Sequence, residues 1–275
     1  MTKSMTKVKS HVRRPSTLKT KTAVKSKAGE KIQKVLANYG IESRREIERW
    51  IEMGRIQVNG KNATIGQRVK PTDRIHVDHQ LIAQEEQEPD TRVIIYHKTP
   101  EEICTRQDPE KRKTVYDALP KLRKSRWISI GRLDFTTSGL MLFTNNGVLA
   151  NKLTKNTKNI EREYLVRVRG KATQEMIDRM LRGVHFPTGK GFFSKIIFHA
   201  GEGINNWYFI VLTERNNRFI KSLWESQGLL VSRLKQIRFG PIALAKQVHQ
   251  GCWTELKNQS LQAVLDLANQ NIRAF

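Results

Sequence analysis

The apolar residues near the start of the chain predict two short helices followed by a β-hairpin. They recur at helical spacing over residues 32–39 and again over 44–53, and Ser43 stands where a helix N-cap is expected. Apolar and polar residues then alternate into Asn59-Gly60, a pair typical of two-residue hairpin turns. We therefore expect a small unit of two helices and a few strands that ends near residue 78.

The remainder of the chain predicts a larger domain in which strands and helices mix irregularly. Helical spacing occurs over 172–182 and 218–227. Strands are expected at apolar runs rich in β-branched and aromatic residues, which cover 93–96, 127–130, 141–144, 164–168, 195–198, 207–212 and 234–239. Because helices do not follow the strands in regular alternation, a doubly wound sheet is disfavoured. The predicted fold class is α+β, with a mixed, largely antiparallel sheet and flanking helices.

Composition marks the boundaries between these units. The first 28 residues hold nine Lys and Arg, no Asp or Glu, and no apolar period, which is typical of a disordered tail. A second segment, before the larger domain, is acidic and poor in apolar side chains, as flexible linkers are. The predicted organisation is a basic tail over 1–28, a small module over 29–78, an acidic linker over 79–92, a large domain over 93–256 and a C-terminal extension over 257–275.

The net charge narrows the class of partner. The sequence has 50 Lys and Arg against 26 Asp and Glu, a formal charge of +24, which favours a polyanion such as nucleic acid. No apolar run approaches the roughly 18 residues of a spanning helix, so we expect no integral membrane protein. Cys104 and Cys252 lie far apart and outside any metal-binding spacing, and no secretory segment occurs. A cytoplasmic protein without a disulfide framework or metal site is expected.

The small module resembles the S4 RNA-binding domain. The matching runs are Lys-Val-Leu-Ala-Asn-Tyr-Gly at 34–40, Ser-Arg-Arg-Glu at 43–46 and Gly-Arg-Ile-Gln-Val-Asn-Gly-Lys at 54–61. Taken singly, each cation in these runs would be interpreted as a solvated surface charge. The resemblance as a whole implies RNA binding, with contacts from Lys34, Ser43, Arg44, Arg45, Arg55 and Lys61.

The stretch over 131–147 is the most informative for chemistry. It reads Gly-Arg-Leu-Asp-Phe-Thr-Thr-Ser-Gly-Leu-Met-Leu-Phe-Thr-Asn-Asn-Gly and places Asp134 in a turn between two apolar strands. A carboxylate flanked by apolar residues is costly unless it is paired or used in chemistry. From the residues alone two interpretations stay open: Asp134 caps the turn through its side chain, or it is a functional carboxylate.

This stretch resembles the G-R-L-D-x-x-T-x-G-L-L-L-x-T-N-D-G signature of pseudouridine synthases, in the branch that contains RsuA and RluB. With the likeness over 160–168, 221–225, 231–234 and 251–256, the resemblance spans most of residues 29–256. It implies isomerisation of a uridine in ribosomal RNA, with the target base flipped into a cleft, and it implies no cofactor and no metal. The stretch over 201–208 is similar to RluB-type members, which favours large-subunit (23S) RNA, or the assembling large subunit, as the partner of a monomeric enzyme.

The same resemblance implies roles for four residues. Asp134 is expected to be the catalytic aspartate, whether it attacks C1′, attacks the uracil ring or removes the 2′-proton. Tyr164 would stack on the flipped base and act on a proton, and Lys221 would pair with Asp134 and keep it ionised. Arg132 would occupy the space that the flipped base leaves or brace the RNA. Without the resemblance, Tyr164, Lys221 and Arg132 would be interpreted as ordinary strand, helix-surface and surface residues.

The sequence also departs from the family pattern. The departures are Thr99, Asn146, Arg215, Asn216, Phe219, Ser222 and Gln236. They keep two alternatives open: a small-subunit (16S) pseudouridine synthase, and a catalytically weak RNA-binding or ribosome-assembly protein of the same fold. Binding to DNA is a third alternative, which rests on charge alone.

Overall fold

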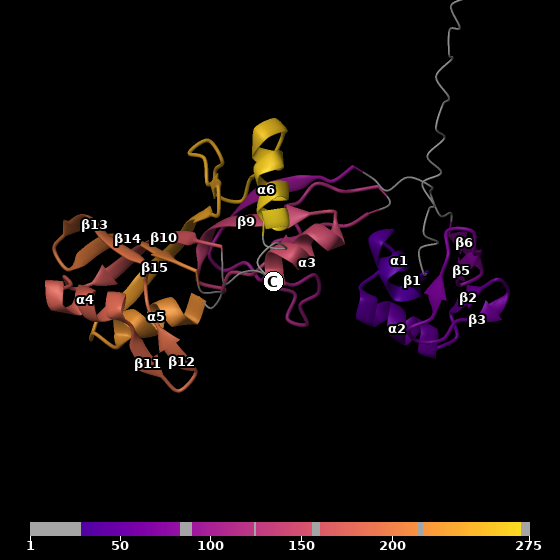
Figure 1. Ribbon diagram of the computed structural model, residues 1–275, viewed down its shortest axis with the longest axis horizontal. Coiled ribbons are helices and arrows are strands. Elements are labelled where there is room, and N and C mark those ends of the chain that lie inside the picture. The colour runs from indigo at the N-terminus through magenta and orange to yellow at the C-terminus, as the bar shows by residue number, and fades with distance from the viewer. Residues whose placement is uncertain (1–28, 83–89, 124, 156–159, 214–216, 271–275) are drawn as a thin grey trace, which may run out of the picture.

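The computed structural model describes residues 29–82, 90–123, 125–155, 160–213 and 217–270. The chain forms a small N-terminal module and a larger domain (Figure 1). The predicted basic tail lies outside the described residues, as does most of the predicted acidic linker. Within the described ranges, no helix is long and apolar enough to span a bilayer.

The N-terminal module packs two helices against a small sheet. The helices are α1 (Ile32–Asn38) and α2 (Arg44–Glu52). The sheet has the order β3-β2-β5-β6, with β2 (Ile56–Val58), β3 (Lys61–Asn62), β5 (Ile75–Val77) and β6 (Gln80–Ile82), while β1 (Glu30–Lys31) pairs with β4 (Arg68–Val69). The predicted helices and hairpin are confirmed, and β6 adds a strand just after residue 78.

Local sequence explains the helix start and the hairpin turn of this module. The Ser43 hydroxyl accepts a hydrogen bond from the Glu46 amide at 3.1 Å and so caps α2, because the first amides of a helix have no partner within it. Asn59 and Gly60 have φ angles of 51° and 81°, the left-handed pair that a type I′ hairpin turn requires. The apolar faces of both helices and of the strands form one core.

The larger domain is built on a nine-stranded sheet in the described part of the chain. Its order is β13-β14-β10-β15-β9-β7-β17, with β16 beside β15 and β8 beside β9. The strands are β7 (Val93–Lys98), β8 (Ile128–Ile130), β9 (Ser138–Thr144), β10 (Arg162–Arg169), β13 (Lys195–Glu202), β14 (Asn205–Leu212), β15 (Leu230–Phe239), β16 (Ile242–Ala243) and β17 (Trp253–Glu255). The pairing of β15 with β9 is parallel and the others are antiparallel, which confirms the predicted mixed, largely antiparallel sheet.

Helices cover opposite faces of the two ends of this sheet. The helices α3 (Gly147–Lys155) and α6 (Asn258–Gln270) share a core with Leu140 and Leu142 of β9. The helices α4 (Gln174–Arg182) and α5 (Asn217–Glu225) share the other core with Met141 and Phe143. Because successive residues of a strand point to opposite faces, the two helix pairs pack against opposite faces of β9.

A glycine allows the two ends of the sheet to join. In the parallel pairing, Gly139 of β9 lies beside Gln236 of β15. A Cβ atom on Gly139 would lie 2.1 Å from the Gln236 carbonyl oxygen, and the φ angle of Gly139 is +108°. Only glycine fits such an approach without displacing the neighbouring strand. Gly139 therefore brings the loop before β9 next to the strands β10 and β15.

Candidate functional site

Asp134 lies in the loop that connects β8 to β9. Its backbone carbonyl accepts a hydrogen bond from the Thr137 amide at 3.1 Å, which closes a turn at the end of the loop. The preceding residue, Leu133, is buried in the core, whereas Phe135 is 44% exposed. Asp134 itself is half-buried. The carboxylate is therefore held at the boundary between the core and solvent, as a group that acts on a large substrate must be.

A buried lysine fixes this loop. Lys98, the last residue of β7, is completely buried, and its ammonium donates to the backbone oxygens of Thr137 at 2.8 Å, Phe135 at 3.3 Å and Thr99 at 2.8 Å. Burial lowers the pKa of Lys98, while nearby negative groups, Asp134 among them, oppose that shift. Two of the three acceptors, Phe135 and Thr137, lie one and three residues after Asp134, so Lys98 positions the turn that carries the aspartate.

The segment after Lys98 holds the loop from a second side. The Glu101 amide donates to the Phe135 carbonyl at 2.8 Å, and the Cys104 thiol donates to the Leu133 carbonyl at 3.2 Å. Both carbonyls flank Asp134. The loop is thus tied through its backbone on either side of the aspartate, which restricts the places that the carboxylate can occupy.

Glu102 ties this holding segment to the core. It is 1% exposed and accepts hydrogen bonds from the Tyr96 hydroxyl at 2.7 Å and the Thr99 amide at 3.1 Å, and it pairs with Lys113 at 2.7 Å. Burial alone would raise the pKa of Glu102, but the bonds from Lys113, Tyr96 and the Thr99 amide together lower it. Glu102 is therefore an ionised, fully partnered carboxylate.

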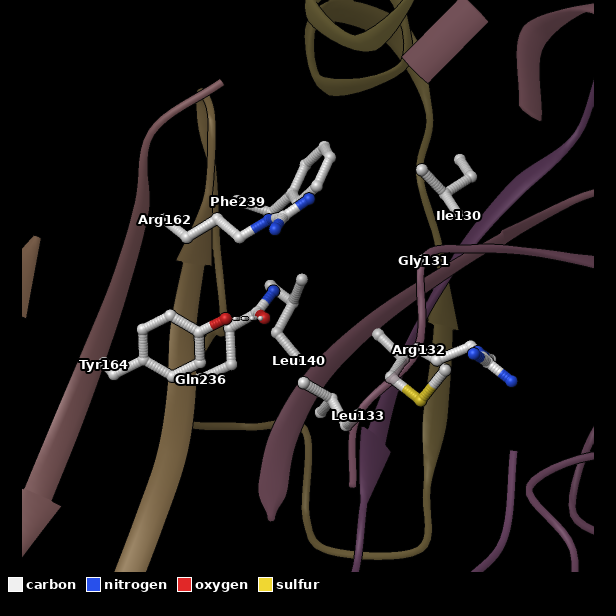
Figure 2. Close-up of a pocket in the computed structure, with 10 residues that line it drawn as sticks. Ile130, Gly131, Arg132, Leu133, Leu140, Arg162, Tyr164, Gln236 and Phe239 are labelled. Atoms are coloured by element: carbon white, nitrogen blue, oxygen red, sulfur yellow. Dashed lines mark hydrogen bonds between the residues drawn. The ribbon is translucent and has the colours of Figure 1, made fainter. Parts of the chain in front are cut away.

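Tyr164 lies on β10, on the face of the sheet that carries the α4 and α5 core. It is fully buried, and its hydroxyl donates to the Gln236 side-chain oxygen at 2.9 Å (Figure 2). Burial raises the pKa of Tyr164 to about 12, and the charge of Asp134 adds to this rise. The hydroxyl is neutral at physiological pH and can donate a proton or a hydrogen bond.

A small pocket lies between Tyr164 and the Asp134 loop. Its volume is about 20 Å³, room for about one water molecule, and its lining includes Leu133 and Gln236. The buried Arg162 side chain extends over the Phe239 ring at 5.2 Å, whereas the exposed Arg132 side chain points away from Tyr164 (Figure 2). A nucleobase needs more room than this, so side chains must move before a base can reach Tyr164.

Lys221 reaches the same loop from α5. Its ammonium donates to the Thr136 hydroxyl at 3.0 Å, two residues after Asp134. α5 thus contributes a cation next to the turn that carries the aspartate, although this bond is made to the neighbouring threonine. Lys221 lies near the predicted place, and its pairing with Asp134 stays a prediction.

The predicted RNA-binding residues of the small module do not share one surface role. Arg45 and Lys61 are exposed, and Ser43 is the cap of α2. Arg55 pairs with Asp78 and lies over the Trp50 ring at 4.2 Å, so its guanidinium also serves the module itself. The remaining two, Lys34 and Arg44, line a groove between the module and the larger domain.

A groove runs between the small module and the larger domain. Lys34 and Arg44 line it on the module side, and Arg126, Asn151 and Lys155 line it on the domain side. Its volume is about 530 Å³. The lining is cationic on both sides, and cations at this spacing can hold successive phosphates of a nucleic acid. In the described ranges no three His, Cys, Asp or Glu side chains gather as a metal site would require.

Sequence reasoning missed two residues of the site and noted a third only as a departure. Lys98 lies in a strand-end motif, but nothing in the sequence shows that its ammonium is buried beneath the Asp134 loop. Arg162 lies on the same face of β10 as the buried Tyr164 and is 4% exposed, but its charge makes a surface position the ordinary expectation. Gln236 replaces a family arginine, and the structure makes it the hydrogen-bond acceptor of Tyr164.

Comparisons with known proteins agree with this geometry. Family models match the chain at residues 92–254, as RNA pseudouridylate synthase, and at residues 30–75, as S4 domain. A solved structure described as a pseudouridylate synthase superposes with a TM-score of 0.58 at 18% identity, covering 86% of this chain and 99% of that one, and so shares the fold.

Curated relatives are more similar in sequence. A ribosomal large subunit pseudouridine synthase B from Pseudomonas aeruginosa is 51% identical over 235 residues, which is 85% of this chain and 61% of the relative. Proteins of the same name from Vibrio cholerae and Escherichia coli strain K12 are 47% and 50% identical, over 86% and 82% of this chain and 75% and 79% of their own lengths. The aligned part thus spans less than two thirds of the Pseudomonas relative.

Proposed function

Because this chain belongs to the RNA pseudouridylate synthase family, we propose that it converts a specific uridine of large-subunit (23S) ribosomal RNA to pseudouridine. Relatives that carry the name ribosomal large subunit pseudouridine synthase B support this substrate. The S4 domain supports an RNA partner. The observation that carries the proposal is the half-buried Asp134 on a loop tied down from three sides beside a buried tyrosine.

The reaction is an isomerisation. The bond from N1 of uracil to C1′ breaks, the uracil turns, and C5 bonds to C1′, while N1 gains a proton and C5 loses one. No atom is lost or gained overall, so the reaction is balanced without a cofactor, and we propose none. The target uridine must leave its stack to reach Asp134, at a cost of a few kcal/mol that is lowest for a base already unpaired.

Asp134 is proposed as the catalytic aspartate. Attack on C1′, attack on the uracil ring and removal of the 2′-proton all need an ionised carboxylate at a fixed place. The bonds from Lys98 and Cys104 to the backbone around Asp134 support such a fixed place. Lys221 is proposed to turn from Thr136 toward Asp134 when RNA binds and to keep the carboxylate ionised.

Tyr164 and Arg132 are proposed to handle the flipped base. Tyr164 lines the small pocket with its hydroxyl protonated, so it can stack on the uracil ring and deliver a proton to it. The pocket has to widen for this, and Arg162 and Gln236, which also line it, are the side chains that would move. Arg132 lines the pocket from the exposed side, where it can fill the space that the base leaves in the RNA.

The groove between the module and the larger domain is proposed to hold the RNA backbone. Its cations, Lys34, Arg44, Arg126 and Lys155, lie on both units, so one RNA segment can bridge them. Arg45 and Lys61 add exposed charge on the module. The domain organisation that we propose is the expected module over 29–78, linker over 79–92 and synthase domain over 93–256, except that β6 (Gln80–Ile82) extends the module into the expected linker. We propose that the protein acts as a monomer in the cytoplasm, where ribosomes assemble.

Chemical mapping of pseudouridine in ribosomal RNA tests this function. RNA from cells with and without the gene is labelled with a carbodiimide and mapped by primer extension. The expected result is one large-subunit pseudouridine that disappears with the gene and returns with the full chain. Loss of a small-subunit site instead would assign a 16S substrate, and an unchanged map would favour an assembly factor without activity.

A further inference from the structure

The half of the sheet formed by β13, β14, β10 and β15 has one covered face and one open face. The covered face carries Tyr208 and Val166, which pack in one core with Trp224 of α5. In Figure 1, α4 and α5 lie on this side of the four strands, and the opposite side carries none of the labelled helices. Because Tyr164 faces the covered side, the open face is turned away from the Tyr164 pocket.

The pairing of the strands places side chains of the open face in rows. One row runs across all four strands through Ile197, Phe209, Leu165 and Lys235. The next row runs through Trp207, Arg167 and Arg233. Phe209 and Trp207 are half-buried, Ile197 is 44% exposed and Arg233 is exposed. Two aromatic rings therefore lie partly exposed on a face that no described helix covers.

The two aromatic rings have planar groups beside them. The His199 ring lies tilted by 51° against the Phe209 ring, with centroids 4.6 Å apart, and the Arg167 guanidinium lies 5.6 Å over the Trp207 ring. Arg167 is held there, since its Nε donates to the Ser232 hydroxyl at 2.9 Å. A planar cation beside an aromatic ring is a platform on which a base can stack.

The charge of this face is positive. Its cations are Lys195, Arg167, Arg169, Arg233 and Lys235. Two acidic residues lie on this face, Glu163, which pairs with Arg238 at 3.0 Å, and Glu202 on the edge strand β13, so the cations outnumber them. A surface that binds a protein of mixed charge needs acidic groups as well, whereas one that binds RNA needs cations around accessible rings.

We propose that this open face, defined by Trp207, Phe209, Arg167, Arg233 and Lys235, binds an unpaired segment of the RNA substrate outside the catalytic cleft. The proposal rests on the proposed RNA-modifying function and extends it. Bases of the segment stack on Trp207 and Phe209, and its phosphates lie against the arginines. An RNA that binds on both faces of the sheet follows a fixed path around the synthase domain. The second contact raises the affinity for RNA without adding groups to the catalytic cleft.

Binding measurements with the full chain test the proposal. The background is Asp134→Asn, so that turnover does not change the RNA, and the probes are a short oligouridylate and a large-subunit RNA fragment. Replacing both rings (Trp207→Ala with Phe209→Ala) should weaken binding about 30-fold or more, since each lost stacking contact weakens it about fivefold or more. Replacing both arginines (Arg167→Gln with Arg233→Gln) should lower the slope of log affinity against log salt by about 1.4, since each phosphate contact on a single strand contributes about 0.7.

Matched controls lie elsewhere on the domain. Trp253, which is 39% exposed, and the exposed Lys257 are replaced as Trp253→Ala with Lys257→Gln, and affinity and salt slope should match the starting protein. If the ring variant unfolds, the arginine variant still decides, because its replaced side chains are not part of the core. Equal affinity and slope in control and test variants would overturn the proposal.

Two further outcomes distinguish RNA binding at this face from protein binding, and this proposal from the proposed catalytic function. If the variants keep RNA affinity but no longer associate with precursor large-subunit particles, the face contacts a ribosomal protein and the proposal is wrong. The proposed function is tested separately, by turnover in the protein that retains Asp134. Absent turnover with the predicted loss of binding would contradict the function but support the face.

Discussion

The Tyr164 hydroxyl donates to the side-chain oxygen of Gln236 at 2.9 Å, and the two residues are direct partners on the neighbouring strands β10 and β15. The family has an arginine where this chain has Gln236. A glutamine can accept a hydrogen bond from a protonated tyrosine, whereas an arginine cannot. Burial raises the pKa of Tyr164 to about 12 and keeps its hydroxyl protonated, and Gln236 gives that proton an acceptor beside the Asp134 loop.

Tyr164→Phe should slow pseudouridine formation by about 100-fold or more, because it removes the proposed proton donor while keeping the ring. The matched control is Tyr208→Phe, another fully buried tyrosine, whose hydroxyl accepts from the Ala172 amide at 2.9 Å. Both changes should cost about 1 kcal/mol of unfolding free energy. Single-turnover rates and urea unfolding measure the two effects, and equal rates in both variants would exclude a chemical role for the hydroxyl.

The pKa of Tyr164 also predicts a pH dependence. Because this pKa is raised to about 12, the hydroxyl keeps its proton across the range in which the RNA is stable. The rate should therefore show no loss from tyrosine ionisation between about pH 6 and 10. A fall in rate near pH 10 that Tyr164→Phe abolishes would contradict the buried, hydrogen-bonded state.

Lys98→Met should destabilise the protein by about 2–4 kcal/mol and lower the turnover number. The methionine fills the same space but leaves the carbonyls of Thr99, Phe135 and Thr137 without their donor. Turnover falls because the loop of Asp134 loses its anchor. Urea unfolding and single-turnover rates are compared with Lys121→Met, an exposed lysine whose change should alter neither. Normal turnover in folded Lys98→Met would show that the anchor is dispensable.

Gly139→Ala should destabilise the protein by about 3 kcal/mol or more, since the new Cβ would lie 2.1 Å from the Gln236 carbonyl oxygen. The control is Gly147→Ala, at which the nearest atoms lie 3.4 Å or more from an added Cβ, and it should be nearly neutral. Thermal unfolding of the two variants gives the comparison. Equal melting temperatures would mean that β9 and β15 do not approach as closely as the structure shows.

Glu102→Gln should lower stability at neutral pH but not in acid. The pKa of Glu102 lies below its usual 4.5, so its contribution is complete above about pH 4.5 and is lost as the pH falls through the lowered value. At pH 7 the variant should be less stable by about 1–2 kcal/mol, because a carboxylate bonded to Lys113 is replaced by an amide. Urea unfolding from pH 7 downward measures the difference, which should shrink as the pH falls below 4.5, and a difference that does not change with pH would contradict the assignment.

The strands and the small module could be predicted because short-range patterns determine them. Asn59-Gly60 predicts its own turn, and each apolar run in the large domain became a strand, with boundaries moved by a few residues. The helix α3 was missed, since its signal is a cap: the Asn146 side chain accepts from the Val148 and Leu149 amides at 2.9 and 3.1 Å. Asn146, which departs from the family pattern, is therefore the residue that caps the N-terminus of α3.

Another departure, Thr99, has a local explanation that the sequence alone does not contain. Thr99 stands where the family has proline, and its amide donates to Glu102, which a proline could not do. Two residues further on, Glu101 has a φ angle of 68°, the left-handed conformation that favours glycine, so this turn holds a non-glycine residue in an unfavourable conformation. Pairings between distant segments, such as Lys98 with the Asp134 loop, could not be predicted because no local pattern encodes them.

The proposed isomerisation depends most directly on the Asp134 carboxylate. The decisive measurement is carbodiimide mapping of large-subunit ribosomal RNA incubated with the wild-type protein or with Asp134→Asn, at equal occupancy confirmed by a binding assay. We predict one pseudouridine with the wild-type protein and none with the variant, while RNA affinity stays within about twofold. Pseudouridine formed by Asp134→Asn at the wild-type rate would contradict the assignment of this carboxylate as the catalytic group.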